Sequence, residues 1–347
     1  MPWLYDVSFC TLLFSIPKAS RLIPGSSFFV FSDMLNALTI DLEDYFQVNA
    51  FSKIIPFQDW GNYECRIERN THRLLEILSD SGKNPQSEIC NRILATFFIL
   101  GWIAERYPGL IREIKRQGHE IASHGYDHQM ISSVSPKQFR EDVHRSKCIL
   151  EDLTGAIVLG YRAPTFSITY RELWAIEILV KAGYRYDCSI FPVRHDTYGF
   201  PDAPRFPFRI SLKGDGKVEF SPIYFMPGII AGTSFARGLT PGALSLIEFP
   251  PSTIRLYGMN FPISGGGYFR LLPYPLIKRG LQRINRKENQ PFIFYIHPWE
   301  IDPEQPRIRG ARIKAKFRHY INLDKNEEKF VKLLTDFKFS SIQGISK

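Results

Sequence analysis

Seven ionisable side chains of the types that build metal-dependent hydrolytic sites follow short apolar runs of the chain. They are Asp41, Glu43 and Asp44 in TIDLEDYF, His124 and His128 in SHGYDHQ, Arg162 in GYRAP, and His297 in YIHPWE. Taken singly, each has an ordinary structural explanation: an acidic strand end is often a cap, an HxxxH pair is often incidental, and Arg-x-Pro is usually a turn. Only the combination points to chemistry.

Two neutral imidazoles and one carboxylate are a common ligand set for a divalent metal that keeps open positions for water and substrate. Such a metal polarises a carbonyl and lowers the pKa of its water to about 7. Hydrolysis of an amide or ester also needs a base for the water proton, an acid for the leaving nitrogen and donors for the oxyanion. The seven side chains favour a metal-assisted hydrolase.

The elements that carry these residues alternate between strands and helices. Strand-like runs are LNALTIDLEDYF, LATFFILG, HEIAS, VLGYRAP, YRYDCSIF and FIFYIHPWEID. Helical spacing appears in THRLLEILSDSG, PGLIREIKRQG, RELWAIEILVKAG and NEEKFVKLLTDF, and Ser135 and Pro136 mark the start of a further helix. The alternation predicts an α/β protein with a parallel sheet or barrel, whose chemistry lies at the carboxyl ends of the strands.

The 347 residues fit one α/β domain with insertions. Residues 1–33 lack a clear period, so we predict an N-terminal extension outside the fold, and we hypothesise that Met34 is the true start. The predicted barrel spans 34–305, and its part 192–290, dense in Pro and Gly, is expected to be an elaborated insertion. A basic segment and a helix are expected over 306–347.

The formal charge of +9 and the pI near 9.2 favour polyanionic partners. We interpret the basic stretch from Arg307 to Arg318 as a solvated face, and without a recognised binding motif nucleic acid is not an expected partner. The five cysteines form no CxxC pair, which argues against a disulfide framework and against a thiolate zinc site. No apolar run reaches the length of about 20 residues that a transmembrane helix needs.

From Met34 onward, the order of the motifs resembles the polysaccharide deacetylases of the NodB-homology group, carbohydrate esterase family four. An acid-rich first strand, ATFF, HxxxH, RxP, a YD strand and a late strand ending in His follow the family's order. The runs EFPPST, GGGYFRLLPY and FYIHPWEIDPEQPR are similar to the subgroup associated with bacterial exopolysaccharide loci that carry exosortase systems. The resemblance implies a distorted (β/α) barrel, seven-stranded, with an elaborated C-terminal part.

The resemblance also implies roles for individual residues. Asp41 corresponds to the general base, and His124 and His128 correspond to the imidazole ligands of the metal. Arg162 would pair with the base carboxylate and hold it ionised. His297 would be the general acid for the departing amine.

Two further roles follow from the resemblance. Asp187 of the YD motif would position His297 and keep it basic. The first motif of the family has two adjacent aspartates, base then ligand, whereas here the acids are spaced differently. Because Asp41 and Glu43 share one face of a strand, Glu43 is favoured as the carboxylate ligand, with Asp44 second.

The function implied is a metal-dependent hydrolase, with zinc as the default ion, that removes N-acetyl groups from amino sugars of a polysaccharide or its precursor in exopolysaccharide biosynthesis. The expected partners are this glycan and the biosynthesis machinery, in the cytoplasm or peripheral to the inner membrane, with export left open. Two alternatives remain: a hydrolase of another non-peptide amide bond, such as an allantoinase-like enzyme, and a non-catalytic polysaccharide-binding protein. Acetate release compared with ring opening separates the deacetylase from the other amide hydrolase, and an intact metal site without turnover on any acetylated glycan would favour the binding protein.

Overall fold

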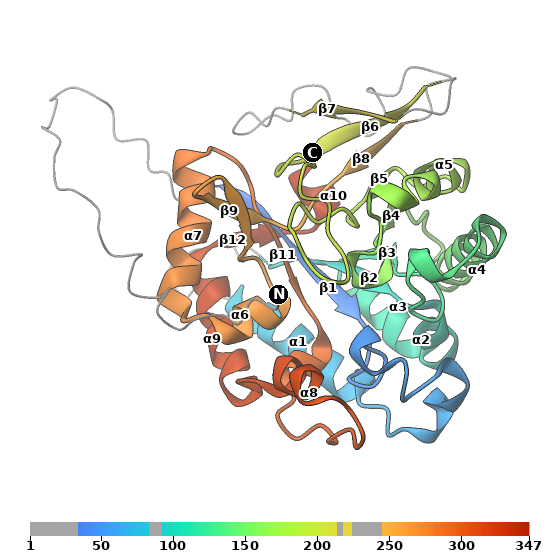
Figure 1. The fold of residues 1–347 in the computed structure, drawn as a ribbon. Coiled ribbons are helices and arrows are strands. Elements are labelled where there is room, and N and C mark those ends of the chain that lie inside the picture. Colours follow the sequence, from blue (N-terminus) through green and yellow to red (C-terminus); the bar gives the residue numbers. More distant parts are fainter. Residues whose placement is uncertain (1–33, 83–91, 214–217, 224–244, 347) are drawn as a thin grey trace, which may run out of the picture. The chain divides into compact units, whose positions relative to one another are not determined.

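The central sheet of the computed structural model contains seven parallel strands in the order β11, β1, β2, β3, β4, β5 and β8 (Figure 1). In this order they span Ile293–Ile296, Leu35–Leu42, Thr96–Ile99, Glu120–Ser123, Gly160–Tyr161, Tyr186–Asp187 and Ser245–Glu248. Ser252, after β8, exchanges hydrogen bonds with Ile293 of β11, so the two ends of the series approach each other. The fold is the distorted (β/α) barrel that the motif order predicts.

The structure describes residues 34–82, 92–213, 218–223 and 245–346. The N-terminal extension expected over 1–33 lies outside the described residues and stays a prediction. Over the described ranges, no helix is both long enough and apolar enough to cross a membrane.

Short strands surround the parallel series. They are β6 (Phe208–Leu212) and β7 (Val218–Pro222), which extend the sheet antiparallel beyond β8, β12 (Lys338–Ser340), which pairs with β1, and the hairpin of β9 (Thr253–Leu256) and β10 (Met259–Pro262). All but β12 lie in the part rich in Pro and Gly that we expected to be an insertion. So does β8, and this part therefore supplies one of the seven barrel strands. The run SLIEFPPSTIRL indicates short strands here, but a strand of four residues does not show by its sequence that it joins the parallel series.

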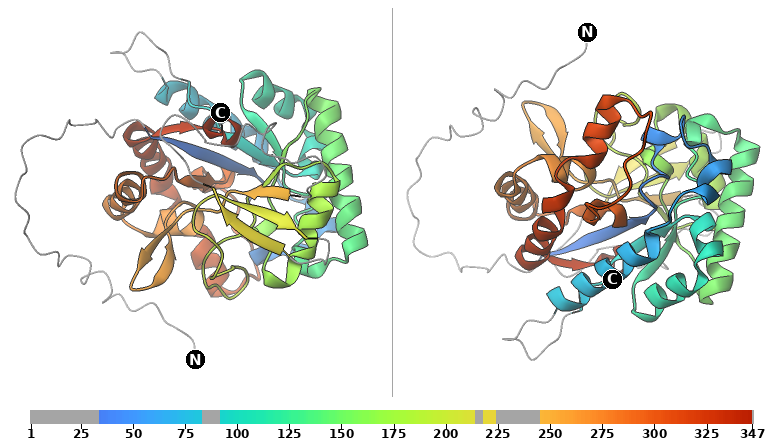
Figure 2. Two further views of the ribbon diagram at one scale, coloured as in Figure 1. Left: turned by 90° about the horizontal axis from the view of Figure 1, so that it is seen from above. Right: turned by 90° about the horizontal axis from the view of Figure 1, so that it is seen from below.

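The helices flank the strands, with α4 and α5 on the opposite side from α7 (Figure 2). Their bounds are Ile67–Ser81 (α1), Gly101–Arg106 (α2), Pro108–Arg116 (α3), Pro136–Thr154 (α4), Trp174–Lys181 (α5), Gly266–Leu271 (α6), Tyr274–Lys287 (α7), Ile313–Tyr320 (α8), Asn326–Asp336 (α9) and Ile342–Ile345 (α10). The predicted start of α4 is confirmed, because Ser135 is its N-cap, Pro136 its first residue, and Ser135 forms a capping box with Gln138.

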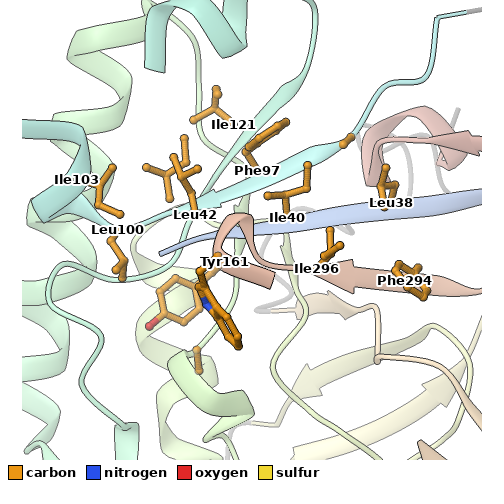
Figure 3. Packing of buried hydrophobic residues seen from close by; sticks show 14 of the residues in the cluster. Leu38, Ile40, Leu42, Phe97, Leu100, Ile103, Ile121, Tyr161, Phe294 and Ile296 are labelled. Carbon is orange, nitrogen blue, oxygen red and sulfur yellow. The ribbon is translucent and has the colours of Figure 1, made fainter. Parts of the chain in front are cut away.

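The buried strand β1 sends its side chains into two separate cores. Leu38, Ile40 and Leu42 pack in the larger core, which the helices cover (Figure 3). Ala37 belongs to a second core on the other face of the strand. Because successive side chains of a strand point to opposite faces, Asp41 lies on the same side as Ala37. The alternation of β1 therefore directs Asp41 to the face opposite the larger core.

Asp142 of α4 anchors the loop that follows β3. Its Oδ1 accepts a hydrogen bond of 2.9 Å from the backbone N–H of Tyr126, within the HxxxH motif. Burial raises the pKa of Asp142 from 3.8 to about 7, although the bond from Tyr126 opposes the rise.

We predict that Asp142 makes stability depend on pH. A carboxyl whose pKa rises on folding holds its proton more tightly in the folded state, so its contribution to the free energy of unfolding falls as the pH rises from 3.8 to about 7. Asp142→Asn keeps an acceptor for Tyr126 and removes the charge. Urea denaturation below and above this pH window should show a smaller loss of stability in the variant, and equal losses would contradict the prediction.

Candidate metal centre and active site

Glu43, His124 and His128 form a cluster in which one ligand atom of each lies within 4.8 Å of the others. Glu43 directly follows β1 and His124 directly follows β3, so the ends of the two strands that flank β2 bring them together. His128 Nε2 lies 2.7 Å from Glu43 Oε2, but this oxygen lacks a partner with hydrogen-bond geometry among the described residues, as does the buried Nδ1 of His128. Two imidazoles and a carboxylate with unsatisfied buried atoms fit a divalent cation.

The imidazole of His124 has a defined orientation. Its Nδ1 lies 2.8 Å from the carbonyl oxygen of Arg162, which places the ring proton on Nδ1 and leaves the Nε2 lone pair for a metal. Burial lowers the pKa of His124 to about 4, so the ring is neutral near pH 7. A neutral imidazole is the form that binds metals.

His128 reaches the same cluster because the loop after β3 turns back on itself. His128 has a φ of 58° and Gly125 a φ of 74°, both in the left-handed region. This region is uncommon for a residue with a side chain, and such conformations persist where the surrounding structure enforces them. The turn folds the second histidine of the motif back against Glu43.

Asp44, our second candidate for the carboxylate ligand, has a different role in the structure. Its Oδ2 accepts the backbone N–H groups of Arg66 (2.6 Å) and Ile67 (3.0 Å), and its Oδ1 accepts that of Tyr45 (2.8 Å). Asp44 therefore caps the first turn of α1. The structure groups Glu43 with the histidines and places Asp44 outside their cluster.

Asp41 and Arg162 form a buried ion pair next to the cluster. The guanidinium Nη1 donates to Asp41 Oδ1 over 2.5 Å and also to Thr39 Oγ1 over 3.0 Å. Arg162 is fully buried, and its Nε donates to the carbonyl oxygen of Cys188 over 3.3 Å. Burial alone would lower the pKa of Arg162, but Asp41 outweighs it and the pKa is raised. The arginine is permanently charged and binds the Oδ1 oxygen of the Asp41 carboxylate.

His297 completes the site from the end of β11. Its Nε2 lies 3.4 Å from Glu43 Oε1 and 3.7 Å from Asp41 Oδ2, while its Nδ1 lies 3.0 Å from Glu300 Oε1. Burial lowers the pKa of His297, but the charges of Glu43, Glu300 and Asp41 outweigh burial and raise it to about 9. The ring can therefore carry a proton at neutral pH.

Asp187 does not contact His297, contrary to our expectation. Its Oδ1 accepts a hydrogen bond of 2.6 Å from the hydroxyl of Ser189, whose oxygen accepts the N–H of Ala163 over 2.7 Å. Burial raises the pKa of Asp187 and of its neighbour Glu248. The carboxylate of Asp187 thus supports the turn that carries Arg162, and not the histidine.

Sequence reasoning missed two side chains that contact the site. Glu300 lies beside His297, and the indole Nε1 of Trp299 donates to Glu43 Oε1 over 3.3 Å. Both belong to the 3-10 turn Pro298–Ile301. The spacing of His297 and Glu300, three residues apart in HPWE, was a usable signal, because a helical turn places such residues on one side.

Two family models match this chain. Residues 90–186 match the model described as polysaccharide deacetylase, and residues 226–347 match a domain of unknown function (DUF3473). The segment 90–186 is therefore similar to the polysaccharide deacetylase family, as the motif order predicted.

Named relatives agree with this assignment. The peptidoglycan-N-acetylglucosamine deacetylase of Bacillus cereus is 33% identical over 88 residues, which are 25% of this chain and 32% of that protein. The chitooligosaccharide deacetylase of Azorhizobium caulinodans is 29% identical over 108 residues, 29% of this chain and 51% of that protein. The chain thus spans a third to a half of these relatives. A putative polysaccharide deacetylase from Mycobacterium smegmatis, of known structure, shares the fold, with a TM-score of 0.52, 19% identity and 94% of both chains covered.

We predict that Glu43, and not Asp44, is needed for metal binding. Glu43→Ala should weaken zinc binding by more than about tenfold, because the cluster loses its carboxylate. Asp44→Ala should bind zinc like the wild type and lower the free energy of unfolding by about 1 kcal/mol, because α1 loses its cap. Calorimetric zinc titration and urea denaturation of both variants measure the two effects. Equal zinc affinities of the two variants would refute this assignment.

Proposed function

We propose that this protein is a metal-dependent deacetylase that hydrolyses the N-acetyl groups of amino sugars in a polysaccharide or its precursor. One observation supports this above all: the cluster of Glu43, His124 and His128 lies beside both an ion-paired carboxylate and a histidine. His297 Nε2 is within 3.4 Å of Glu43 and within 3.7 Å of Asp41. A ligand set, a base and an acid thus share one site.

Each residue has a task in this reaction. Glu43, His124 and His128 would hold the ion, and zinc suits their ligand types. When bound, the ion supplies polarisation of the amide carbonyl and favours ionisation of water. Asp41, paired with Arg162, would accept the proton of the attacking water.

His297 would donate its Nε2 proton to the nitrogen of the N-acetyl group as the amide C–N bond breaks. The products are acetate and a free amine on the sugar. The position of Nε2 next to Asp41 lets the acid and the base act on the same amide. The relatives named as deacetylases of peptidoglycan and of chitooligosaccharide support an amino sugar as the substrate. The charge of +9 and the subgroup resemblance support an exopolysaccharide as the polymer.

We predict that the protein releases acetate from N-acetylglucosamine oligomers and that chelation abolishes the release. Adding zinc back should restore it. Asp41→Asn should bind zinc but lower kcat by about 10²–10⁴-fold, the usual contribution of a general base. Acetate release measured with an enzyme-coupled assay, beside a ring-opening assay on cyclic amides, checks this. Acetate release that persists in chelator, or ring opening without acetate release, would overturn the proposal.

A further inference from the structure

The carboxylate nearest to His297 comes from its own turn. Glu300 is completely buried, and its Oε1 lies 3.0 Å from His297 Nδ1. Burying a carboxylate is costly unless charged or polar partners surround it. The buried Arg270 of α6 lies behind it, with its Nε 3.6 Å from Glu300 Oε1, and Asn326 donates to the backbone oxygen of Glu300 over 3.1 Å. The position of Glu300 is therefore fixed from several sides.

Arg270 is itself fixed in place. It donates to the backbone oxygen of His319, and its guanidinium lies 4.9 Å from the ring centre of Trp299. Trp299 stacks on the ring of His297, with ring centres 5.2 Å apart. The imidazole of His297 is thus held at its Nδ1 edge by Glu300 and on one face by Trp299.

We propose that Glu300, supported by Arg270, is the positioning residue of His297, in the place that we expected Asp187 to take. This rests on the proposed function, in which His297 protonates the leaving amine. Glu300 keeps a proton on Nδ1, so that the second ring proton is on Nε2, the atom that faces Asp41 and Glu43. When Nε2 gives its proton to the amine nitrogen, the neutral ring keeps its Nδ1–H bond to Glu300.

The proposal also assigns a task to the segment matched only as a domain of unknown function. Arg270, His297 and Glu300 all lie within residues 226–347. Asp187 lies outside this segment, and its carboxylate accepts a hydrogen bond from Ser189. The segment would then supply the proton donor of the site together with the groups that orient it.

The matched pair Glu300→Gln and Asp187→Asn tests the proposal. In protein with ¹⁵N-labelled histidine, NMR reads which ring nitrogen of His297 carries the proton in the neutral form, with His297→Gln used to assign the signal. Glu300→Gln should shift the proton from Nδ1, lower kcat by about 10²-fold or more and leave KM and zinc content unchanged. Glu300→Asp should recover part of kcat, and Asp187→Asn should leave the Nδ1 proton of His297 in place.

An unchanged His297 tautomer and unchanged kcat in Glu300→Gln would overturn the proposal. So would loss of the Nδ1 proton in Asp187→Asn but not in Glu300→Gln. The tautomer is read without substrate, so it tests Glu300 even if the wild type hydrolyses no acetylated glycan. That last outcome would instead overturn the proposed function.

An independent observation concerns α8, which exposes two of its apolar side chains to solvent. His319 is buried against Trp299 and Ala315 packs on the core, whereas Ile313 is 87% and Phe317 is 58% exposed. Residues four apart share one face of a helix, so Ile313 and Phe317 form a ridge on the side opposite to Ala315 and His319. An amphipathic helix normally turns such residues to the core.

Cations surround this ridge. The stretch 307–318 contains six Lys and Arg residues and no acid. Lys314 and Arg318 are 69% and 47% exposed at their side chains, with Asp196 nearby at 3.5 Å and 4.0 Å. We infer that α8 docks on an anionic bilayer, where the ridge enters the headgroup layer and the cations face lipid phosphates. A soluble acidic polymer would match the cations but offer Ile313 and Phe317 no apolar environment.

Flotation with vesicles of phosphatidylcholine, with and without phosphatidylglycerol, tests this inference. The wild type should bind the anionic vesicles, and Ile313→Ser with Phe317→Ser should lower the affinity by about tenfold or more. Ile157→Ser is the control, because Ile157 is 74% exposed and lies between α4 and β4. Absence of wild-type binding, or binding that needs Lys314 and Lys316 but not the ridge, would overturn the inference.

Discussion

The buried ion pair of Asp41 and Arg162 is the interaction on which the site depends. Taking two charges out of water is costly, and removing one partner of a buried pair costs about 3–5 kcal/mol, because the other charge is left uncompensated. The pair therefore needs the contacts that surround it: Thr39 and the carbonyl oxygen of Cys188 accept from the guanidinium, and the ring of Phe98 lies 4.1 Å from it. These contacts join the ends of β1, β4 and β5 in one fixed arrangement.

Three separate stretches of the chain meet at this pair. Strand β1 brings Asp41 and Glu43 and lies outside both matched family models. The polysaccharide deacetylase segment brings the two histidines and Arg162, and the C-terminal segment brings His297 with its carboxylate neighbour. The parallel order of the strands makes this convergence possible, because their carboxyl ends gather at one side of the sheet. The site is thus a property of the whole barrel and not of one segment.

Much of this arrangement was predictable from the sequence. Hydrophobic periodicity predicted the alternation of strands and helices, and Ser135 with Pro136 marked the start of α4. The position of polar residues directly after apolar runs predicted that Asp41, Arg162 and His297 would approach each other, since parallel strands end on the same side.

The rest depended on side-chain contacts that no local pattern contains. Strand alternation favoured Glu43 over Asp44, but the role of Asp44 as a cap requires knowing that the first turn of α1 reaches the end of β1. The hydrogen bond of Asp187 to Ser189 and the ion pair of Glu300 with Arg270, thirty positions away, likewise became visible only in the structure. The run SLIEFPPSTIRL indicates short strands, but four residues do not show that β8 pairs with β5 as part of the barrel.

We propose that Glu43, His124 and His128 hold one divalent ion beside Asp41 and His297. Anomalous X-ray diffraction at the zinc absorption edge, from crystals of the wild type grown with zinc, tests it most directly. The account predicts one strong peak within bonding distance of Glu43 and both histidines. No peak there, or a peak bound by Asp44 in place of Glu43, would contradict it.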